Sequence, residues 1–176
     1  MRRRFSVVLA AVILLSGASA SAQEAPQDHL QPFLPDLAKR VALDPTTYVP
    51  ATMLYTSMRL DWVSSQPLFQ NGFVEDNSRF TRNGLVHDAP VSYAEGNRRI
   101  ARDALAVLPI SLANNATSHS IERFLIGRHP NHRKLVRTLG WIERVSFASY
   151  WSYRLSERHF RQWRANEQRA RQLGYN

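Results

Sequence analysis

Three side chains, Asp61, His119 and Glu122, have the types and spacing that acid–base chemistry needs. His119 and Glu122 are three positions apart, which places them on one face of a helix. If that face met Asp61 from a second helix, the histidine would act as a general base and the carboxylates as orienting group and acid. The sequence contains no Gly-x-Ser-x-Gly or Ser-x-x-Lys nucleophile motif, and His-x-x-Glu falls short of a zinc signature. A hydrolase-like enzyme using these residues is therefore the alternative interpretation, and enzymatic activity stays uncertain.

The carboxylate of Asp61 lies on the apolar side of a helix predicted over residues 51–69. At about 100° per residue, one broad arc of this helix holds Leu54, Met58, Trp62, Leu68 and Phe69. Asp61 falls inside this arc. A buried carboxylate must be hydrogen-bonded or ion-paired. We therefore predict that Asp61 is buried within the bundle, with bonds from another helix or from neighbouring hydroxyls, which are those of Ser57, Ser64 and Ser65.

A polar turn follows this helix. Pro67 is expected to kink or end the helix, because it has no N–H and its ring clashes with the preceding turn. Gly72 suits a left-handed cap. Glu75, Asp76 and Asn77 are oxygen donors that a hard cation prefers, but their spacing matches no calcium loop, so capping is the predicted role and no metal or cofactor is expected. The buried polar motif of this stretch comprises Asp61, Ser64, Ser65, Gly72, Glu75 and Asn77.

Residues 60–80 resemble a family of small bacterial helical membrane proteins that has no assigned activity. In that family a helix carries Asp and then Ser or Thr, and a Gly turn leads to Glu-x-Asn-Pro. The matching residues are Asp61, Ser64 or Ser65, Gly72, Glu75 and Asn77, whereas Ser78 stands in place of the proline. The resemblance implies a compact helical hairpin or bundle in the cell envelope. Because no stretch after residue 22 has eighteen uninterrupted apolar residues, a membrane span is not expected here.

A second long helix is predicted from Ser92 to Ile126. Ser92 and Glu95 form a capping box at its start, and Gly127 marks its end. Pro109 is expected to bend it. Small residues that would let another helix approach closely recur every seven positions, namely Ala104, Ser111 and Ser118.

A third long helix is predicted from an Asn131 cap to about Gln172. Its arginines Arg133, Arg137, Arg144 and Arg158 are expected to face away from the core. The predicted packing stripe consists of Leu135, Leu139, Ile142, Ser146, Ser149, Tyr153 and Phe160.

The C-terminal end of this third helix combines cations with aromatic rings. Such a surface suits an anionic membrane or an acidic partner. The competing interpretation is a solvated helix with ion pairs from Glu157 and Glu167 to arginines four positions later. The predicted surface-binding residues are Arg154, Arg158, Phe160, Arg161, Trp163 and Arg164.

The beginning of the chain predicts export. Arg2, Arg3 and Arg4 precede a short apolar run, and small residues follow at 18–22, as in a secretory signal peptide. Cleavage is expected near Ala20 or Ala22, and a retained anchor is the alternative. Removing residues 1–22 lowers the formal charge from +9 to +6. The absence of cysteine excludes disulfides, thiol catalysis and thiolate metal sites.

The sequence therefore predicts an all-α protein with three regions: a signal peptide at 1–22, a proline-rich arm at 23–50 that contains one short helix, and a bundle of about three long helices at 51–176. We expect an exported protein of the periplasm or cell envelope, associated with the membrane, with a non-enzymatic structural or interaction role. Its expected partner is an anionic membrane surface or an envelope protein. Export argues against nucleic acid as a partner.

Overall fold

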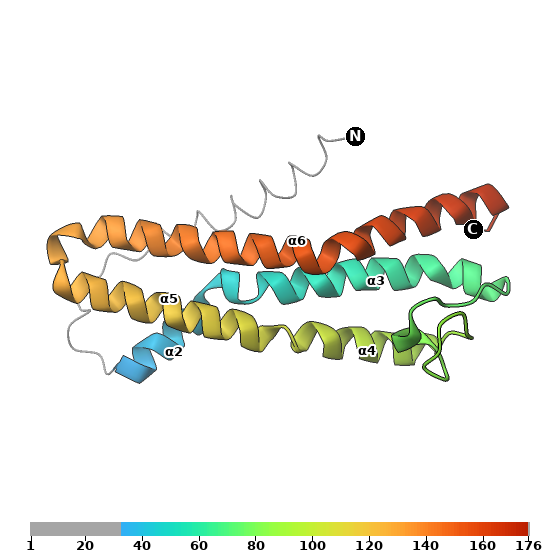
Figure 1. Cartoon of the computed structure of the whole chain (residues 1–176), viewed down its shortest axis with the longest axis horizontal. Helices are drawn as coiled ribbons and strands as arrows, with labels where there is room; N and C mark the ends of the chain where they lie inside the picture. Colours follow the sequence, from blue (N-terminus) through green and yellow to red (C-terminus); the bar gives the residue numbers. More distant parts are fainter. Residues whose placement is uncertain (1–32, 176) are drawn as a thin grey trace. The chain divides into compact units, whose positions relative to one another are not determined.

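The computed structural model describes residues 33–175, so the predicted signal peptide and the first part of the arm lie outside the described residues. The described chain is all-helical, as predicted, and its extended backbone is limited to two isolated bridges. Figure 1 shows the elements in chain order: α2 (Phe33–Leu43), η1 (Pro45–Thr47), α3 (Val49–Gln70), η2 (Ser78–Phe80), α4 (Tyr93–Leu105), α5 (Leu108–Arg128), η3 (Pro130–His132) and α6 (Arg133–Leu173).

The described chain forms two compact units, each built from two separate segments. Unit 1 contains residues 33–50 and 108–151, and unit 2 contains residues 51–107 and 152–175. Chain continuity joins the units at three places, within α3, between α4 and α5, and within α6. Each unit is described by itself below.

In unit 1, α2 packs against α5, and η3 joins α5 to the first part of α6 (Figure 1). The short helix predicted inside the proline-rich arm is α2, and an Asp36–Arg40 ion pair of 2.9 Å links its successive turns. Asp44 follows α2 and caps η1 by accepting the N–H of Thr46. Pro45 occupies the first position of this turn, where a missing N–H costs nothing.

The second predicted helix is two helices in the structure. Ser92 is the N-cap of α4 as predicted, and its hydroxyl accepts the N–H of Glu95. The helix does not bend at Pro109 but ends at Leu105, and α5 starts at Leu108. Pro109 explains the break, because it cannot donate to the carbonyl of residue 105 and its ring would clash with that carbonyl. The break coincides with the boundary between the two units.

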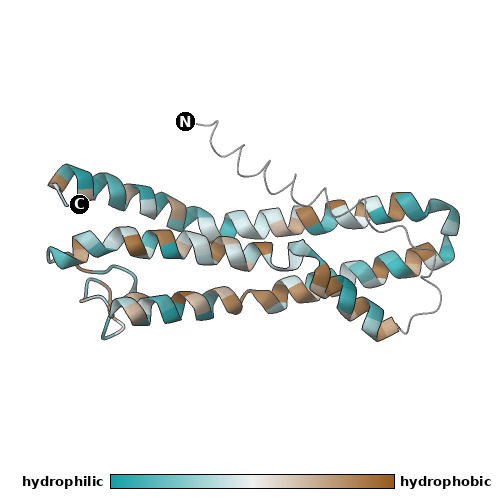
Figure 2. Cartoon of the chain, turned by 180° about the vertical axis from the view of Figure 1, so that it is seen from behind, coloured by the Kyte–Doolittle hydropathy of each residue, from teal (hydrophilic) through white to brown (hydrophobic). Residues whose placement is uncertain are grey.

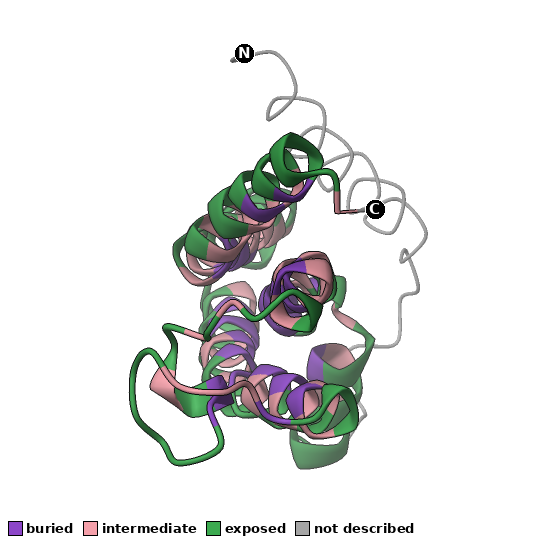
Figure 3. Ribbon diagram, turned by 90° about the vertical axis from the view of Figure 1, so that its right-hand side faces the viewer, coloured by how far each residue is buried: buried purple, intermediate pink, exposed green. Residues whose placement is uncertain are grey.

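The third predicted helix is present as α6, but the predicted packing stripe was wrong. Leu135, Leu139 and Ile142 are 57 %, 56 % and 47 % exposed, and Tyr153 is also exposed. The buried residues of α6 are instead Arg144, Ala148, Ser152, Ser156, Asn166 and Ala170. Figure 3 shows that each helix has a buried and an exposed side, and Figure 2 shows hydrophobic patches on the first half of α6 and a mainly hydrophilic second half.

Unit 2 has a conventional apolar core. The predicted apolar arc of α3 is confirmed by the burial of Leu54, Met58, Trp62 and Leu68, which lie with Phe80, Val91, Ile100 and Ala104 in the core. Pro67 does not end α3, which continues to Gln70, and Gly72 then adopts φ +86° in the turn. Gly96 permits a close approach of Trp62 to α4, because a Cβ at Gly96 would lie 2.3 Å from ring atoms of Trp62.

Candidate functional site

The interior of unit 1 is polar. The inward side of α5 consists of Ser111, Asn115, Ser118, His119 and Glu122, all buried. Asn115 donates through Nδ2 to the hydroxyls of Thr46 and Thr47, at 2.9 and 2.7 Å, and so fixes α5 to the turn after α2. The small residues predicted to allow close packing, Ser111 and Ser118, therefore belong to a hydrogen-bonded interior.

Arg144 lies at the centre of this interior and is 6 % exposed. Its Nε lies 2.8 Å from Oδ2 of Asp44, and one terminal nitrogen lies 3.1 Å from Oε2 of Glu122. The same nitrogen donates to the hydroxyl of Ser118 at 3.2 Å. The prediction that Arg144 faces away from the core was wrong, because the half-buried carboxylate of Asp44 and the buried carboxylate of Glu122 compensate its charge.

Asp44 binds three of the polar groups around it. Its carboxylate accepts from Nε2 of His119 at 3.1 Å and from both the N–H and the hydroxyl of Thr46. Burial alone would raise the pKa of Asp44, but the hydrogen bonds from His119 and Thr46 and the charge of Arg144 together lower it to about 2. The carboxylate is therefore ionised at neutral pH and holds the cluster together.

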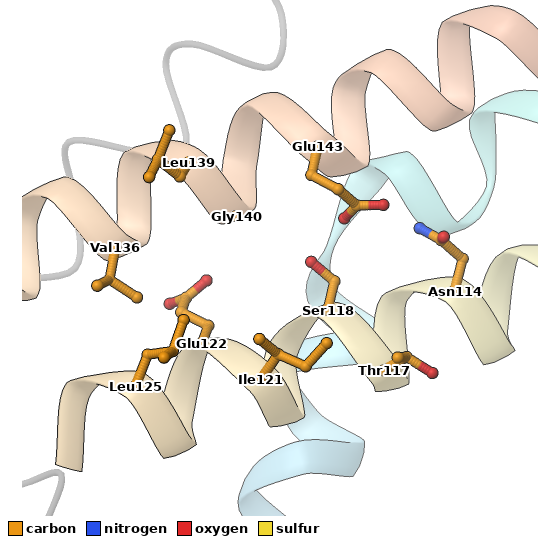
Figure 4. A pocket seen from close by; sticks show the side chains of 10 residues that line it. All are labelled: Asn114, Thr117, Ser118, Ile121, Glu122, Leu125, Val136, Leu139, Gly140 and Glu143. Atoms are coloured by element: carbon orange, nitrogen blue, oxygen red, sulfur yellow. The ribbon is translucent and has the colours of Figure 1, made fainter. Parts of the chain in front are cut away.

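A groove of about 330 Å³ opens beside this cluster, between α5 and α6 (Figure 4). Gly140 forms part of its wall, because a Cβ at this position would lie 2.7 Å from Oε2 of Glu122 and 3.1 Å from a terminal nitrogen of Arg144. The lining residues are Asn114, Thr117, Ser118, Ile121, Glu122, Leu125, Val136, Leu139, Gly140 and Glu143.

The second polar cluster is in unit 2 and is centred on Asp61. Its Oδ2 atom lies 2.9 Å from Nδ1 of His159, and its Oδ1 atom accepts from Nδ2 of Asn166 at 3.1 Å. The hydroxyls of Ser64 and Ser65 donate to the backbone carbonyl of Asp61, not to its carboxylate. The side chain is 19 % exposed, so Asp61 is half-buried and is satisfied by α6, one of the two predicted sources.

His159 and Asn166 were not identified from the sequence. They lie on α6 at a separation of seven, which places them on the same side of the helix. Asn166 also donates to Ser65 at 2.8 Å and accepts from Gln162 at 2.9 Å. The seven-residue spacing is visible in the sequence, but nothing local identifies Asp61 as the partner.

Asp61 and His159 line a groove of about 510 Å³ in unit 2. The Nε2 atom of His159 makes no hydrogen bond to a described residue. Glu75 also lines this groove, where burial raises its pKa and the charges of Asp61 and Asp76 add to the rise, while the N–H of Asn77 opposes it. A histidine oriented by a carboxylate, in the same groove as an acid of raised pKa, is a combination suited to proton transfer.

The prediction of a buried polar motif was wrong for most of its members: only Ser65 is buried, and Gly72 and Asn77 are exposed in the turn. The remaining residues have local roles. The N–H of Asn77 donates to Glu75, and the Asn77 side chain caps η2 by accepting the N–H of Arg79. The predicted capping role is confirmed for Asn77, whereas the side chain of Asp76 pairs with Nδ1 of His87 at 2.7 Å. The three predicted acid–base residues divide between the units, with His119 and Glu122 inside unit 1 and Asp61 in unit 2. Each binds partners within its own unit, respectively Asp44, Arg144 and His159.

The predicted surface-binding segment is partly exposed. Arg154, Arg158, Arg161 and Arg164 are exposed, but Phe160 and Trp163 are half-buried and contact each other at 6.4 Å between ring centroids. Trp163 also donates to Glu167, and it shares the side of α6 that carries Ser156, His159 and Asn166. The ion pairs Glu157–Arg161 and Glu167–Arg171 are present but long, at 3.7 and 3.9 Å.

Searches of protein-family models, curated proteins and solved structures find no match to this chain. Among the described residues, none of the helices combines the length and hydropathy needed to cross a bilayer.

Proposed function

We propose that this protein is an exported, non-enzymatic interaction protein of the bacterial cell envelope, and that unit 1 attaches it to an anionic membrane surface. The observation that carries the proposal is the inverted polarity of unit 1. The charged side chains of Glu122 and Arg144 are buried in its interior and that of Asp44 is half-buried, whereas large apolar side chains lie outside. Soluble monomers rarely expose contiguous apolar surface without a binding role.

The apolar face of unit 1 is defined here by Ile121, Phe124, Leu125, Leu135, Leu139 and Ile142, all exposed. Leu135, Leu139 and Ile142 form one stripe of α6, since they are separated by four and three positions. Ile121 and Leu125 lie across the groove from Leu139. Leucine and isoleucine gain about 1.5–3 kcal/mol each when fully removed from water, so covering this face would strongly favour binding.

Charge selects an anionic surface as the partner. Residues 121–143 contain five basic side chains, at 123, 128, 133, 134 and 137, and two acidic side chains, the buried Glu122 and the exposed Glu143. Arg123 also pairs with Asp36 at 2.9 Å, so the surface keeps an excess of positive charge. Each basic residue close to an anionic leaflet adds about 1 kcal/mol of attraction. Two copies of this surface would repel each other, which argues against self-association. The C-terminal arginines 154, 158, 161 and 164 would add attraction without contributing an apolar anchor.

Vesicle sedimentation of the purified protein tests this role. We expect binding to vesicles containing phosphatidylglycerol, weakened by salt, and little binding to pure phosphatidylcholine vesicles. Leu139→Ser should weaken the affinity by roughly tenfold, whereas the control Leu105→Ser, at an exposed leucine of unit 2, should leave it unchanged. Equal binding by both variants would exclude the apolar face as the contact.

The C-terminal segment is tested separately by a full-length variant in which Arg154, Arg158 and Arg161 are replaced by glutamine. If the apolar face is the anchor, this variant should bind with a reduced salt dependence and should still respond to Leu139→Ser. Complete loss of vesicle binding in this variant would show that the C-terminal segment, and not the apolar face, is the membrane-binding surface.

A hydrolytic enzyme is the second candidate, and the Asp61–His159 pair favours it. His159 would accept a proton from water as the hydroxide adds to an ester carbonyl, and Glu75 would donate a proton to the leaving alkoxide. p-Nitrophenyl acetate is a suitable probe. This candidate predicts turnover that falls at least about tenfold in His159→Ala and persists in the control His129→Ala, an exposed histidine of unit 1. A rate no higher than that of buffer would eliminate it.

A further inference from the structure

The groove between α5 and α6 has two chemically different ends. Ile121, Leu125, Val136 and Leu139 line one end, and Asn114, Thr117, Ser118 and Glu143 line the other (Figure 4). Its volume of about 330 Å³ is at the lower limit of roughly 300–1,000 Å³ for ligand sites. A narrow groove with one apolar end and one polar end fits a slender amphiphile.

The part of the groove between these two ends carries little net charge. Glu122 lines the groove, but Arg144 compensates its charge at 3.1 Å, and the hydroxyl of Ser118 already accepts from Arg144. The absence of a side chain at Gly140 leaves room for the Glu122–Arg144 ion pair, because a methyl group at this position would collide with both side chains. The wall therefore contributes shape and little net charge.

The polar end offers acceptors to a ligand. The carboxylate of Glu143 is exposed and makes no hydrogen bond or ion pair with a described residue. The hydroxyl hydrogen of Thr117 is used on the carbonyl of Ala113, and the amide nitrogen of Asn114 donates to Asn115. What remains is the full negative charge of Glu143, together with neutral oxygens and two neutral donors, the second amide hydrogen of Asn114 and the hydroxyl hydrogen of Ser118. The charge of Glu143 therefore selects a cationic group with N–H donors.

We infer that this groove binds one membrane lipid with a primary-amine headgroup, with its ammonium group at Glu143 and the beginning of an apolar chain between Leu125 and Leu139. This inference rests on the proposed function, because the groove lies within the apolar face that would contact the bilayer. Glu143 supplies the attraction for the ammonium group, and the exposed Arg128 and Lys134 supply positive charge for the lipid phosphates. A quaternary amine lacks the N–H donors and would bind less tightly.

Short amphiphiles test the site without a bilayer. Monomeric dodecylammonium, titrated into the full-length protein and followed by calorimetry, should bind more tightly than dodecyl sulfate. Glu143→Gln should reduce the dodecylammonium affinity by at least about tenfold, and Ile121→Trp should reduce it by obstructing the apolar end. The matched control is Glu157→Gln, which removes the same charge from the same helix in unit 2. Thermal unfolding of each variant establishes that it is folded.

Vesicles then identify the source of the amine. At a fixed fraction of phosphatidylglycerol, phosphatidylethanolamine vesicles should bind more tightly than phosphatidylcholine vesicles, and Glu143→Gln should abolish the difference. Equal binding of the two vesicles, or a preference that survives Glu143→Gln, overturns the amine site and leaves the proposed attachment to anionic membranes intact. Dodecylammonium binding without binding to any vesicle overturns both the proposed attachment and a membrane lipid as the ligand.

Discussion

Replacing Arg144 by methionine removes the buried cation that the carboxylates of Asp44 and Glu122 share. The guanidinium lies 2.8 Å from Asp44 and 3.1 Å from Glu122, and it is 6 % exposed. Methionine has a similar length but leaves both carboxylates without a counter-charge. Removing one partner of a buried ion pair typically costs about 3–5 kcal/mol. The Arg144→Met variant should lose a comparable amount of stability, which is a large fraction of the stability of an ordinary domain.

Urea unfolding followed by circular dichroism measures this loss. The matched control is Arg154→Met, at an exposed arginine of the same helix, for which we expect a change within about 0.5 kcal/mol. Adding Asp44→Asn and Glu122→Gln to Arg144→Met should recover part of the loss, because the uncompensated charges disappear. Equal unfolding midpoints for the two single variants, or a combined variant less stable than Arg144→Met, would refute the role assigned to this cluster.

Three further changes test other parts of the structure. Gly96→Ala places a methyl group 2.3 Å from the ring of Trp62 and should cost about 1–3 kcal/mol by overpacking, whereas Gly127→Ala, in open space, should be neutral or stabilising in the same thermal melt. Asp61→Ala should cost about 1–3 kcal/mol by leaving the partner side chains on α6 unpaired, so an unchanged melting temperature would contradict its structural role. The pKa of Asp44 is about 2 in the folded protein and near 3.9 when unfolded. Its ionisation therefore contributes roughly 2 kcal/mol to the free energy of unfolding above pH 4, and this contribution is lost as the pH falls through about 2. The stability difference between wild type and Asp44→Asn should shrink over that range, and a constant difference would exclude this linkage.

Local chemistry in the sequence was sufficient to predict several elements. The spacing of Ser92 and Glu95 predicts a helix start, and Ser92 is the N-cap of α4. Gly72 occupies the left-handed turn after α3. The apolar arc of α3 is buried as its 3.6-residue period predicts. These features depend on interactions over one or two turns, which neighbouring residues largely determine.

The outcome at Pro109 was not decided by local chemistry alone. Proline predicts a disturbance of the helix, and the sequence allows either a bend or an end. The structure ends α4 at Leu105 and assigns the following helix to a different unit. Which outcome occurs depends on whether the segments before and after the proline pack against the same neighbours.

The tertiary structure alone decided which side of α6 is buried. The period of Leu135, Leu139 and Ile142 predicts an apolar stripe, but a period cannot say whether that stripe faces the core or solvent. Arg144 is buried instead, because Asp44 and Glu122 arrive from other elements to compensate its charge. The partners of Asp61 also come from a distant part of the chain, since His159 lies 98 positions away in the sequence. The sequence determines a side chain's type and its local spacing. The partner that offsets the desolvation of a buried charge is determined only when distant segments pack together.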